Sequence, residues 1–264
     1  MAGDIKTLQF ATGVSSTTST GSVFQSKTAN YTALVTDRVI AVDASSNDVT
    51  ITLPAASGNT GVQYVIKRTD DASANAFDVT IDGNSSETID GRTTRKLCTQ
   101  YGYISIICDG STWHVMEYKD TIILHARVGT LHLPTFANYD PIEFDTATID
   151  KCKGFNTGTY GFTSPEARRY NLTVFIQTTS LSNGLSIQVF PAIDAAEQTD
   201  IGHYSFHNTT GSTQYLDPYF RFRWSAIVTL ADGEVFDLRS HGSGAYAIDD
   251  DYTFFQLESI DEIY

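Results

Sequence analysis

Histidine, serine and carboxylate side chains are the groups in this sequence that could support acid–base, nucleophilic or metal-assisted chemistry. His203 and His207 are four residues apart, a spacing that would let both rings bind one metal ion from the face of a helix. Their segment instead has the composition of a strand, where this spacing separates the rings by about 13 Å. The sequence contains no G-x-S-x-G or HExxH motif. We therefore expect no catalytic residues and no enzyme.

Asp249, Asp250 and Asp251 form the densest run of charge. Oxygen-rich loops suit calcium, so these carboxylates are candidate ligands. Consecutive residues of an extended chain point to alternating sides, however, and three of them cannot all face one ion. We favour a solvated loop and expect no metal or other cofactor, with calcium as the alternative.

Composition excludes several classes of partner. The chain of 264 residues is 41% hydrophobic and 12% aromatic, which is enough for a packed core, and its net charge is −14. Residues 118–264 hold 9 basic and 19 acidic side chains, a net of −10. An acidic chain without basic clusters is poorly suited to nucleic acid. No apolar run approaches membrane-spanning length, so we expect no membrane insertion.

The cysteines and the N-terminus bear on where the protein folds. Cys98, Cys108 and Cys152 form an odd set without metal-like spacing. Cys98 and Cys108 lie on successive predicted strands and could face each other. The alternative, which we favour, is that both are small buried hydrophobic residues in a chain folded in a reducing cytoplasm. The N-terminus has one lysine and no apolar core of leader length, so we expect no ordinary export.

The segment 155–176 carries the clearest strand pattern. Its alternating apolar residues predict a half-buried strand: Tyr170, Leu172, Val174 and Ile176. Phe175 falls on the opposite face, away from this core side. Gly158 and Gly161 flank Tyr160 and allow a bend or a close backbone approach there. Pro165 ends sheet pairing before the strand.

The same segment resembles a known family. The order Gly158, Tyr160, Gly161, Phe162, Pro165 and Tyr170 is similar to the signature of the globular head shared by the complement first component and tumour necrosis factor. Further similarity at 126–128, 141–145, 230–238 and 253–255 extends the resemblance over about residues 121–262. Arg169 departs from the pattern, in which a glycine usually precedes the tyrosine. The resemblance implies a ten-stranded jelly roll in residues 121–264 that forms a homotrimer, with Phe175 as a trimer-interface candidate.

Residues 25–117 have a second resemblance. Short predicted strands follow one another, and Asp109-Gly110 indicates a hairpin within residues 96–116 in which Trp113 would cap a core. The order of VTITLP at 49–54, TIDG at 88–91 and this hairpin is similar to a small β module of bacteriophage tail fibres. We therefore expect an all-β chain, a small β module followed by a jelly-roll β-sandwich.

Residues 1–24 precede this module and include a tract of serine, threonine and glycine at 12–22 typical of a flexible linker. Ile5, Leu8 and Phe10 are apolar residues ahead of the tract and are virion-anchor candidates that could dock onto other virion proteins. The alternative is a disordered terminus with no partner.

Together the two resemblances imply a bacteriophage virion protein, a trimeric fibre or spike that attaches to a host cell-surface glycan or protein through its head. Tyrosines in predicted loops are the receptor-binding candidates: Tyr139, Tyr215, Tyr219 and Tyr246. One alternative is a capsid-decorating head-fibre trimer without essential receptor binding. Another is a surface-polysaccharide depolymerase, although the long repeats usual in that class are not seen. A non-viral bacterial adhesin is a further alternative that the missing leader disfavours.

Overall fold

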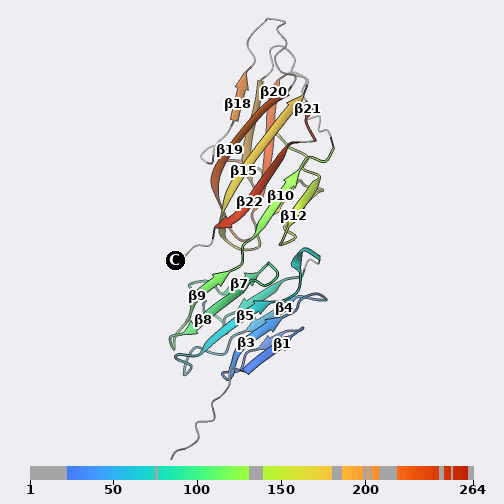
Figure 1. Ribbon diagram of the computed structural model, residues 1–264. Coiled ribbons are helices and arrows are strands. Elements are labelled where there is room, and N and C mark those ends of the chain that lie inside the picture. Colours follow the sequence, from blue (N-terminus) through green and yellow to red (C-terminus); the bar gives the residue numbers. More distant parts are fainter. Residues whose placement is uncertain are drawn as a thin grey trace, which may run out of the picture.

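The computed structural model describes residues 23–74, 77–130, 139–179, 186–198, 201, 204–207, 219–243, 247–250 and 252–260. Its regular structure is β-strand apart from one turn of 3₁₀-helix, η1 at Ala72–Ala74, which confirms the all-β expectation. Two stacked parts are visible in Figure 1: a first module of strands β1 to β9 and a head of strands β10 to β22. Within the described ranges there is no helix long and apolar enough to cross a membrane.

The first six strands of the first module alternate between two sheets as the chain proceeds, and the last three close the sheets. One sheet has the order β1 (Val23–Lys27), β3 (Asp37–Val42), β5 (Gln63–Arg68), β8 (Tyr103–Cys108) and β9 (Trp113–Lys119). The other has the order β2 (Tyr31–Thr32), β4 (Val49–Thr52), β6 (Val79–Asp82) and β7 (Thr94–Leu97). The first three strands of each sheet pair in parallel, and β7, β8 and β9 pair antiparallel. The chain therefore winds as irregular coils of a short two-sheet solenoid closed by antiparallel strands.

The coils have unequal lengths, which is why no repeat is visible in the sequence. Phe24 pairs with Val39, but Val39 pairs with Val65, so the distance along the chain changes from one coil to the next. The absence of sequence repeats is therefore no argument against a solenoid here. The hairpin at Asp109-Gly110 is confirmed: β8 pairs with β9, and Gly110 has a φ of +99°. Trp113 is fully buried between the sheets, as expected.

The head consists of two antiparallel sheets. The first has the order β12 (Thr146–Asp150), β10 (Ile123–Arg127), β22 (Phe254–Ile260), β15 (Arg168–Thr179) and β19 (Tyr219–Leu230), with β21 (Ala247–Ile248) paired to β15. The second has the order β13 (Phe155–Asn156), β14 (Gly161–Thr163), β20 (Val235–Ser243), β16 (Ser186–Ile193) and β17 (Ala196–Glu197), with β11 (Asp140–Pro141) on β20 and β18 (Tyr204–His207) on β16. β10 and β22, far apart in sequence, are neighbours, and β14 to β16 alternate between the sheets. This strand order confirms the jelly roll.

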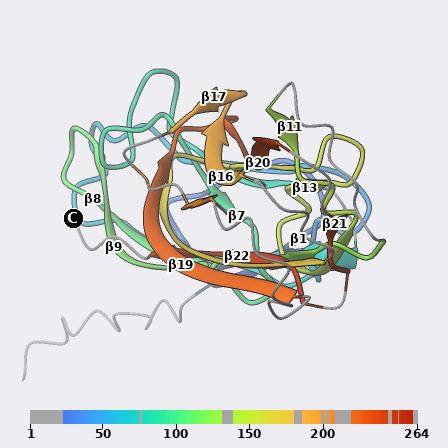
Figure 2. The same ribbon diagram turned by 90° about the horizontal axis from the view of Figure 1, so that it is seen from above.

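Viewed along its length in Figure 2, the head shows β19 and β22 in one layer and β16 and β20 in the other. The predicted alternation in β15 is confirmed, because its inward side chains are all buried in the head cluster: Tyr170, Leu172, Val174 and Ile176. Phe236 and Leu238 of β20 meet them from the second sheet. At Gly161 a Cβ would lie 2.7 Å from Val235 Cγ1, so glycine permits the close pairing of β14 with β20.

The segment Pro191 to Gln198 has a helix-leaning composition, yet it folds as the end of β16, a tight turn and β17. Pro191 lies within β16 opposite Leu238, and its carbonyl accepts a hydrogen bond from Gln198 N at 2.9 Å. Asp194 and Ala195 have φ angles of +48° and +66° and make the tight turn into β17. Pairing with β20 overrides the local preference of this segment.

Candidate functional site

An aromatic row crosses the outer face of the first head sheet. Phe175 of β15 pairs with Phe254 of β22, and their rings stack with centroids 5.8 Å apart and planes 10° apart. His125 of β10 stacks on the other side of Phe254 at 4.9 Å. All three are half-buried. Phe175 therefore points away from the core, as the alternation predicts, and is one of three rings that cover neighbouring strands. We call His125, Phe254 and Phe175 the aromatic row.

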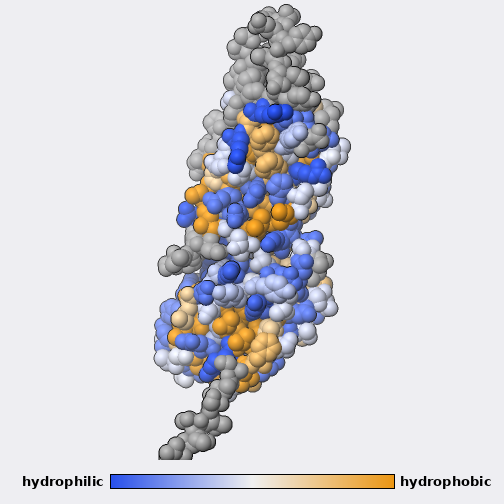
Figure 3. Space-filling view, viewed as in Figure 1, coloured by the Kyte–Doolittle hydropathy of each residue, from blue (hydrophilic) through white to orange (hydrophobic). Residues whose placement is uncertain are grey.

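One apolar side chain extends the aromatic row toward a sheet edge: Ile149 of β12 pairs with His125 and is 43% exposed. Ile227 of β19 is 52% exposed but lies apart from the row, because it pairs with Asn171 and Arg223 pairs with Phe175. Figure 3 shows hydrophobic residues among charged ones on this side of the head. A contiguous apolar strip on a sheet face is a mark of an interaction surface, whereas single exposed apolar residues are ordinary.

His125 is suited to such a strip because burial lowers the pKa of its imidazole, with a further contribution from Arg127. Its Nδ1 lies 2.5 Å from Thr148 Oγ1. The ring is therefore largely neutral at pH 7 and can be covered without burying a charge.

Of the four tyrosines predicted to contact a receptor, only Tyr139 has a side chain within the described part of the structure. Tyr139 is 44% exposed, stacks on His241 with centroids 4.6 Å apart and meets Phe190 edge-on at 5.5 Å. It packs against its own neighbours and still presents part of its ring. Tyr219 is the first residue of β19, and its side chain lies outside the described part. Tyr215 and Tyr246 also lie outside it, as do the anchor candidates Ile5, Leu8 and Phe10.

The acidic run is not a uniformly solvated loop. Asp249 is buried, and its carboxylate accepts a hydrogen bond from Gln177 Nε2 at 2.8 Å. A solvated loop is therefore the wrong expectation at Asp249, because β21 pairs with β15 and brings this residue onto the sheet. Asp250 is half-buried, and Asp251 lies outside the described residues. In the described part of the chain, no three acidic, cysteine or histidine side chains are placed to hold a metal ion.

A buried polar cluster joins the two modules. Arg168, at the start of β15, donates to Glu166 Oε1 at 2.9 Å, to the backbone carbonyl of Asp120 at 2.6 Å and to the carboxylate of Asp120 at 3.1 Å. The same guanidinium also bonds to Tyr118 Oη. Asp120 follows β9 and is fully buried. We call Tyr118, Asp120, Glu166 and Arg168 the junction cluster.

The first module binds the junction cluster from its other side. The amides of Cys98 and Thr99 donate to the Asp120 carboxylate at 2.9 and 2.7 Å. The amide of Lys96 donates to Glu166 Oε2 at 3.2 Å, and Arg95 lies over the Tyr118 ring at 4.6 Å. The buried carboxylates are therefore satisfied from both modules.

Electrostatics in the junction cluster follow from burial. Burial is the main cause that raises the pKa of Tyr118 well above its usual range, and the charge of Asp120 adds to it. Burial alone would lower the pKa of Arg168, but Tyr118, Glu166 and Asp120 raise it, so the guanidinium remains charged. Tyr118 thus stays neutral and Arg168 stays charged near neutral pH, which suits a structural joint.

Sequence reasoning missed this cluster, although one signal was present. Ser164, Glu166 and Arg168 have the same alternation as Tyr170 and are all buried. Charged residues that alternate together with the core-facing residues of a strand indicate a buried ion pair. Their partners are distant in sequence, so the pattern does not identify them.

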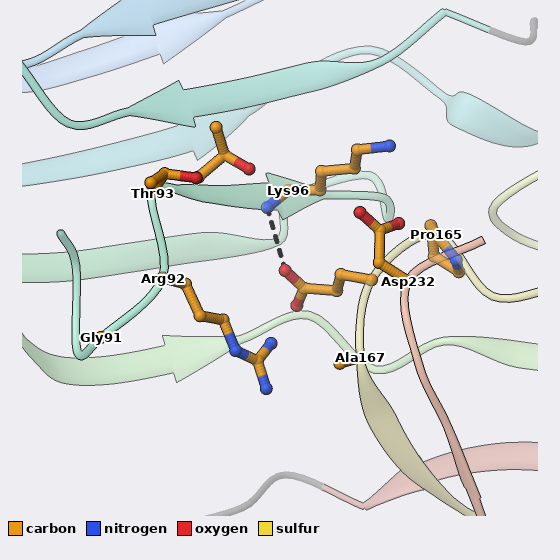
Figure 4. A pocket seen from close by; sticks show the side chains of 9 residues that line it. Gly91, Arg92, Thr93, Lys96, Pro165, Ala167 and Asp232 are labelled. Atoms are coloured by element: carbon orange, nitrogen blue, oxygen red, sulfur yellow. Dashed lines mark hydrogen bonds between the residues drawn. The ribbon is translucent and has the colours of Figure 1, made fainter. Parts of the chain in front are cut away.

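A polar pocket of about 380 Å³ adjoins the junction cluster. Figure 4 shows Arg92 and Lys96 from the first module and Asp232 from the head around it. Lys96 Nζ lies 3.3 Å from a carboxylate oxygen of Asp78. Burial would lower the pKa of Lys96, whereas the charges of Asp78 and Asp232 raise it. Opposite charges from both modules line the pocket, so it belongs to their contact.

Comparison with known proteins adds little to this description. No protein-family model matches the sequence. No curated protein matches it either. Similar solved structures include Eiger TNF from S. frugiperda, with 13% identity, a TM-score of 0.41 and coverage of 55% of this chain and 95% of that one. The globular domain of zebrafish complement 1qA protein has 14% identity and a TM-score of 0.38, covering 54% and 98%. Murine APRIL at pH 5.0 has 10% identity and a TM-score of 0.39, covering 53% and 100%.

At such identities and TM-scores these likenesses carry no argument about activity or partners. The jelly-roll assignment rests on the strand order of the head itself.

Proposed function

We propose that this chain is a homotrimeric structural protein of a bacteriophage particle, a fibre or spike whose head attaches to the host cell surface. The observation that carries the proposal is the aromatic row on the outer face of the head sheet. Its rings have no role in the head core and would be covered by a neighbouring copy.

A threefold assembly suits this surface. In a ring with threefold rotational symmetry, the sheet face of each copy packs against the flank of the next copy. The ring closes after three copies, so no such face is left uncovered. Burying the rings would stabilise the contact by roughly 25 cal/mol per Å² of apolar surface. The neutral imidazole of His125 can be covered with the two phenylalanines at no cost in buried charge. The resemblance to trimeric heads points to the same assembly.

The first module serves as a stem in this proposal. Its order of strands and turns resembles a tail-fibre module, and Figure 1 shows it stacked end to end with the head. The junction cluster joins the two through Asp120 and Arg168, both buried. Residues 1–24 would attach the stem to other virion proteins through Ile5, Leu8 and Phe10.

Receptor contact would use short-range forces. The negative charge of the head opposes non-specific capture by an anionic cell surface, but at physiological salt this repulsion extends only about 8 Å. An exposed tyrosine ring such as that of Tyr139 can stack on a sugar or an aromatic side chain. A glycan or protein receptor fits such a surface.

Adsorption competition with immunolabelling tests this function. The purified full-length protein should bind host cells and reduce adsorption of the particle, and antibody against it should label the particle. Labelling of the capsid without any competition would replace host attachment with capsid decoration. Absence of the protein from the particle would overturn the virion assignment, and shortening of purified surface polysaccharide would make the protein a depolymerase.

A further inference from the structure

Two cysteines from different modules meet beneath the junction cluster. Cys98 directly follows β7 of the first module, yet it is buried in the hydrophobic cluster of the head. Cys152 follows β12 of the head, is half-buried and packs against the same cluster. Both residues pack in one hydrophobic cluster, and after burial, Cys98 is among the groups that raise the pKa of the Cys152 thiol. Both are free in this structure.

Cys108 is not part of this pair. It belongs to the hydrophobic cluster of the first module, and its thiol donates to the carbonyl of Ala56 at 3.4 Å. The facing arrangement of Cys98 and Cys108 that the sequence allows is therefore wrong, whereas the burial of both is confirmed.

Hydrogen bonds fix the backbone on both sides of the Cys98–Cys152 contact. The amide of Cys98 donates to the Asp120 carboxylate at 2.9 Å. In the turn that contains Cys152, the Asp150 carboxylate accepts from the amides of Gly154 and Phe155, each at 3.1 Å. The two sulfur atoms are thus held together by contacts that do not depend on a bond between them.

We propose that Cys98 and Cys152 form a disulfide that links the first module covalently to the head when the protein meets a low-molecular-weight disulfide. Cys152, the more accessible, loses its proton and attacks one sulfur of the reagent, which breaks the reagent S–S bond and releases one small thiolate. The Cys98 sulfur, also deprotonated, then attacks the Cys152 sulfur of this mixed disulfide and releases the second. The two cysteines lose two electrons and two protons, and the reagent gains them as two thiols.

The environment keeps the pair reduced until such a reagent is present. Burial, with a contribution from Cys98, raises the pKa of the Cys152 thiol well above its usual range, so little thiolate exists near neutral pH. In a reducing cytoplasm the two thiols would persist, and they would close after the protein reaches an oxidising medium. The link spans the segment between the modules and restricts the unfolded chain. This inference does not depend on the proposed function.

Peptide mapping of the full-length protein tests the link. After incubation with oxidised glutathione, alkylation and digestion with trypsin, we expect peptide 97–119 to be joined to peptide 152–153, and the intact chain to lose two hydrogen atoms. Because peptide 97–119 contains both Cys98 and Cys108, Cys108→Ser is the matched control and should retain the joined pair. Cys98→Ser and Cys152→Ser should each lose it. The oxidised wild type should also unfold at a higher temperature than the reduced protein.

Three outcomes would overturn the proposal. They are a wild-type product that ends as glutathione on Cys152, a disulfide between two chains, and a joined peptide that persists in Cys98→Ser. If one serine variant fails to fold, the wild-type map and the Cys108→Ser control still decide the pairing.

Discussion

Arg168 of the head donates a hydrogen bond of 2.6 Å to the backbone carbonyl of Asp120, the residue that follows the last strand of the first module. The same guanidinium pairs with the Asp120 carboxylate at 3.1 Å, and both residues are buried. Both charged groups have lost their contact with water and interact with each other instead. Separating the two modules would therefore break a buried ion pair.

Replacing Arg168 should therefore destabilise the protein strongly. In Arg168→Met the carboxylates of Asp120 and Glu166 remain buried without their cation, and we expect the free energy of unfolding to fall by about 3–5 kcal/mol. Urea denaturation at fixed protein concentration measures the change. Asp78→Asn is the control, because it removes a more exposed ion pair with Lys96 and should cost about 1 kcal/mol or less. Equal losses in the two variants would contradict a stabilising junction cluster.

The two described histidines of the strands β9 and β10 should titrate in a defined order. A hydrogen bond of 2.9 Å from His114 Nε2 to the Asp109 carboxylate is the main cause that raises the pKa of His114 above 6.5, and Asp90 adds to it. Burial lowers the pKa of His125 below 6.5. NMR titration of the imidazole signals should place His114 above His125. Asp109→Asn should bring His114 back toward 6.5, and the reverse order of the two rings would contradict the contacts described.

Stability follows these pKa shifts with opposite signs. The pKa of His114 is raised in the folded protein, so protonation of His114 stabilises the fold. This contribution to the free energy of unfolding is complete below about pH 6.5, the pKa in the unfolded chain, and is lost as the pH rises through the higher pKa of the folded protein. The pKa of His125 is lowered, so folding opposes its protonation and stability falls as pH drops below 6.5. Denaturation of His114→Gln and His125→Gln across this range should remove the two dependences separately.

Local pattern was enough to predict parts of both modules. The alternation from Tyr170 to Ile176, the outward Phe175 and the Asp109-Gly110 hairpin all depend on neighbours in sequence, and the structure confirms each. The solenoid was not predictable in this way. The residues of β3 do not indicate whether its partners are parallel or antiparallel, and these partners, β1 and β5, lie at unequal distances along the chain.

The candidate sites were predicted less completely, because they too depend on which strands become neighbours. Phe175 was identified because its place in an alternating strand is a local property. Phe254 and His125 lie beside it only because β22 and β10 pair next to β15. The meeting of Cys98 with Cys152 depends on how the modules dock, which no spacing in the sequence encodes.

The N-terminal anchor remains a prediction about residues outside the described part. Changing Ile5, Leu8 and Phe10 together to serine should leave the assembly of the free protein unchanged and abolish its incorporation into particles. Quantitative immunoblotting of purified particles measures incorporation, and the matched change of Ser16, Ser19 and Ser22 to alanine should have no effect. Normal incorporation of the triple serine variant would favour a terminus without a partner.

The aromatic row should be required for assembly. Phe175→Glu places a carboxylate against Phe254, where a covering copy would have to desolvate it, and we expect loss of the trimer. Met116→Glu is the matched control, since Met116 is 61% exposed on β9 of the first module. A trimer that tolerates Phe175→Glu as well as Met116→Glu would place the contact elsewhere.

The mass of the unmodified protein in solution tests the central claim most directly. Sedimentation equilibrium at micromolar concentration should give three times the 28.9 kDa of one chain. A mass of 28.9 kDa under the same conditions would contradict assembly through the aromatic row.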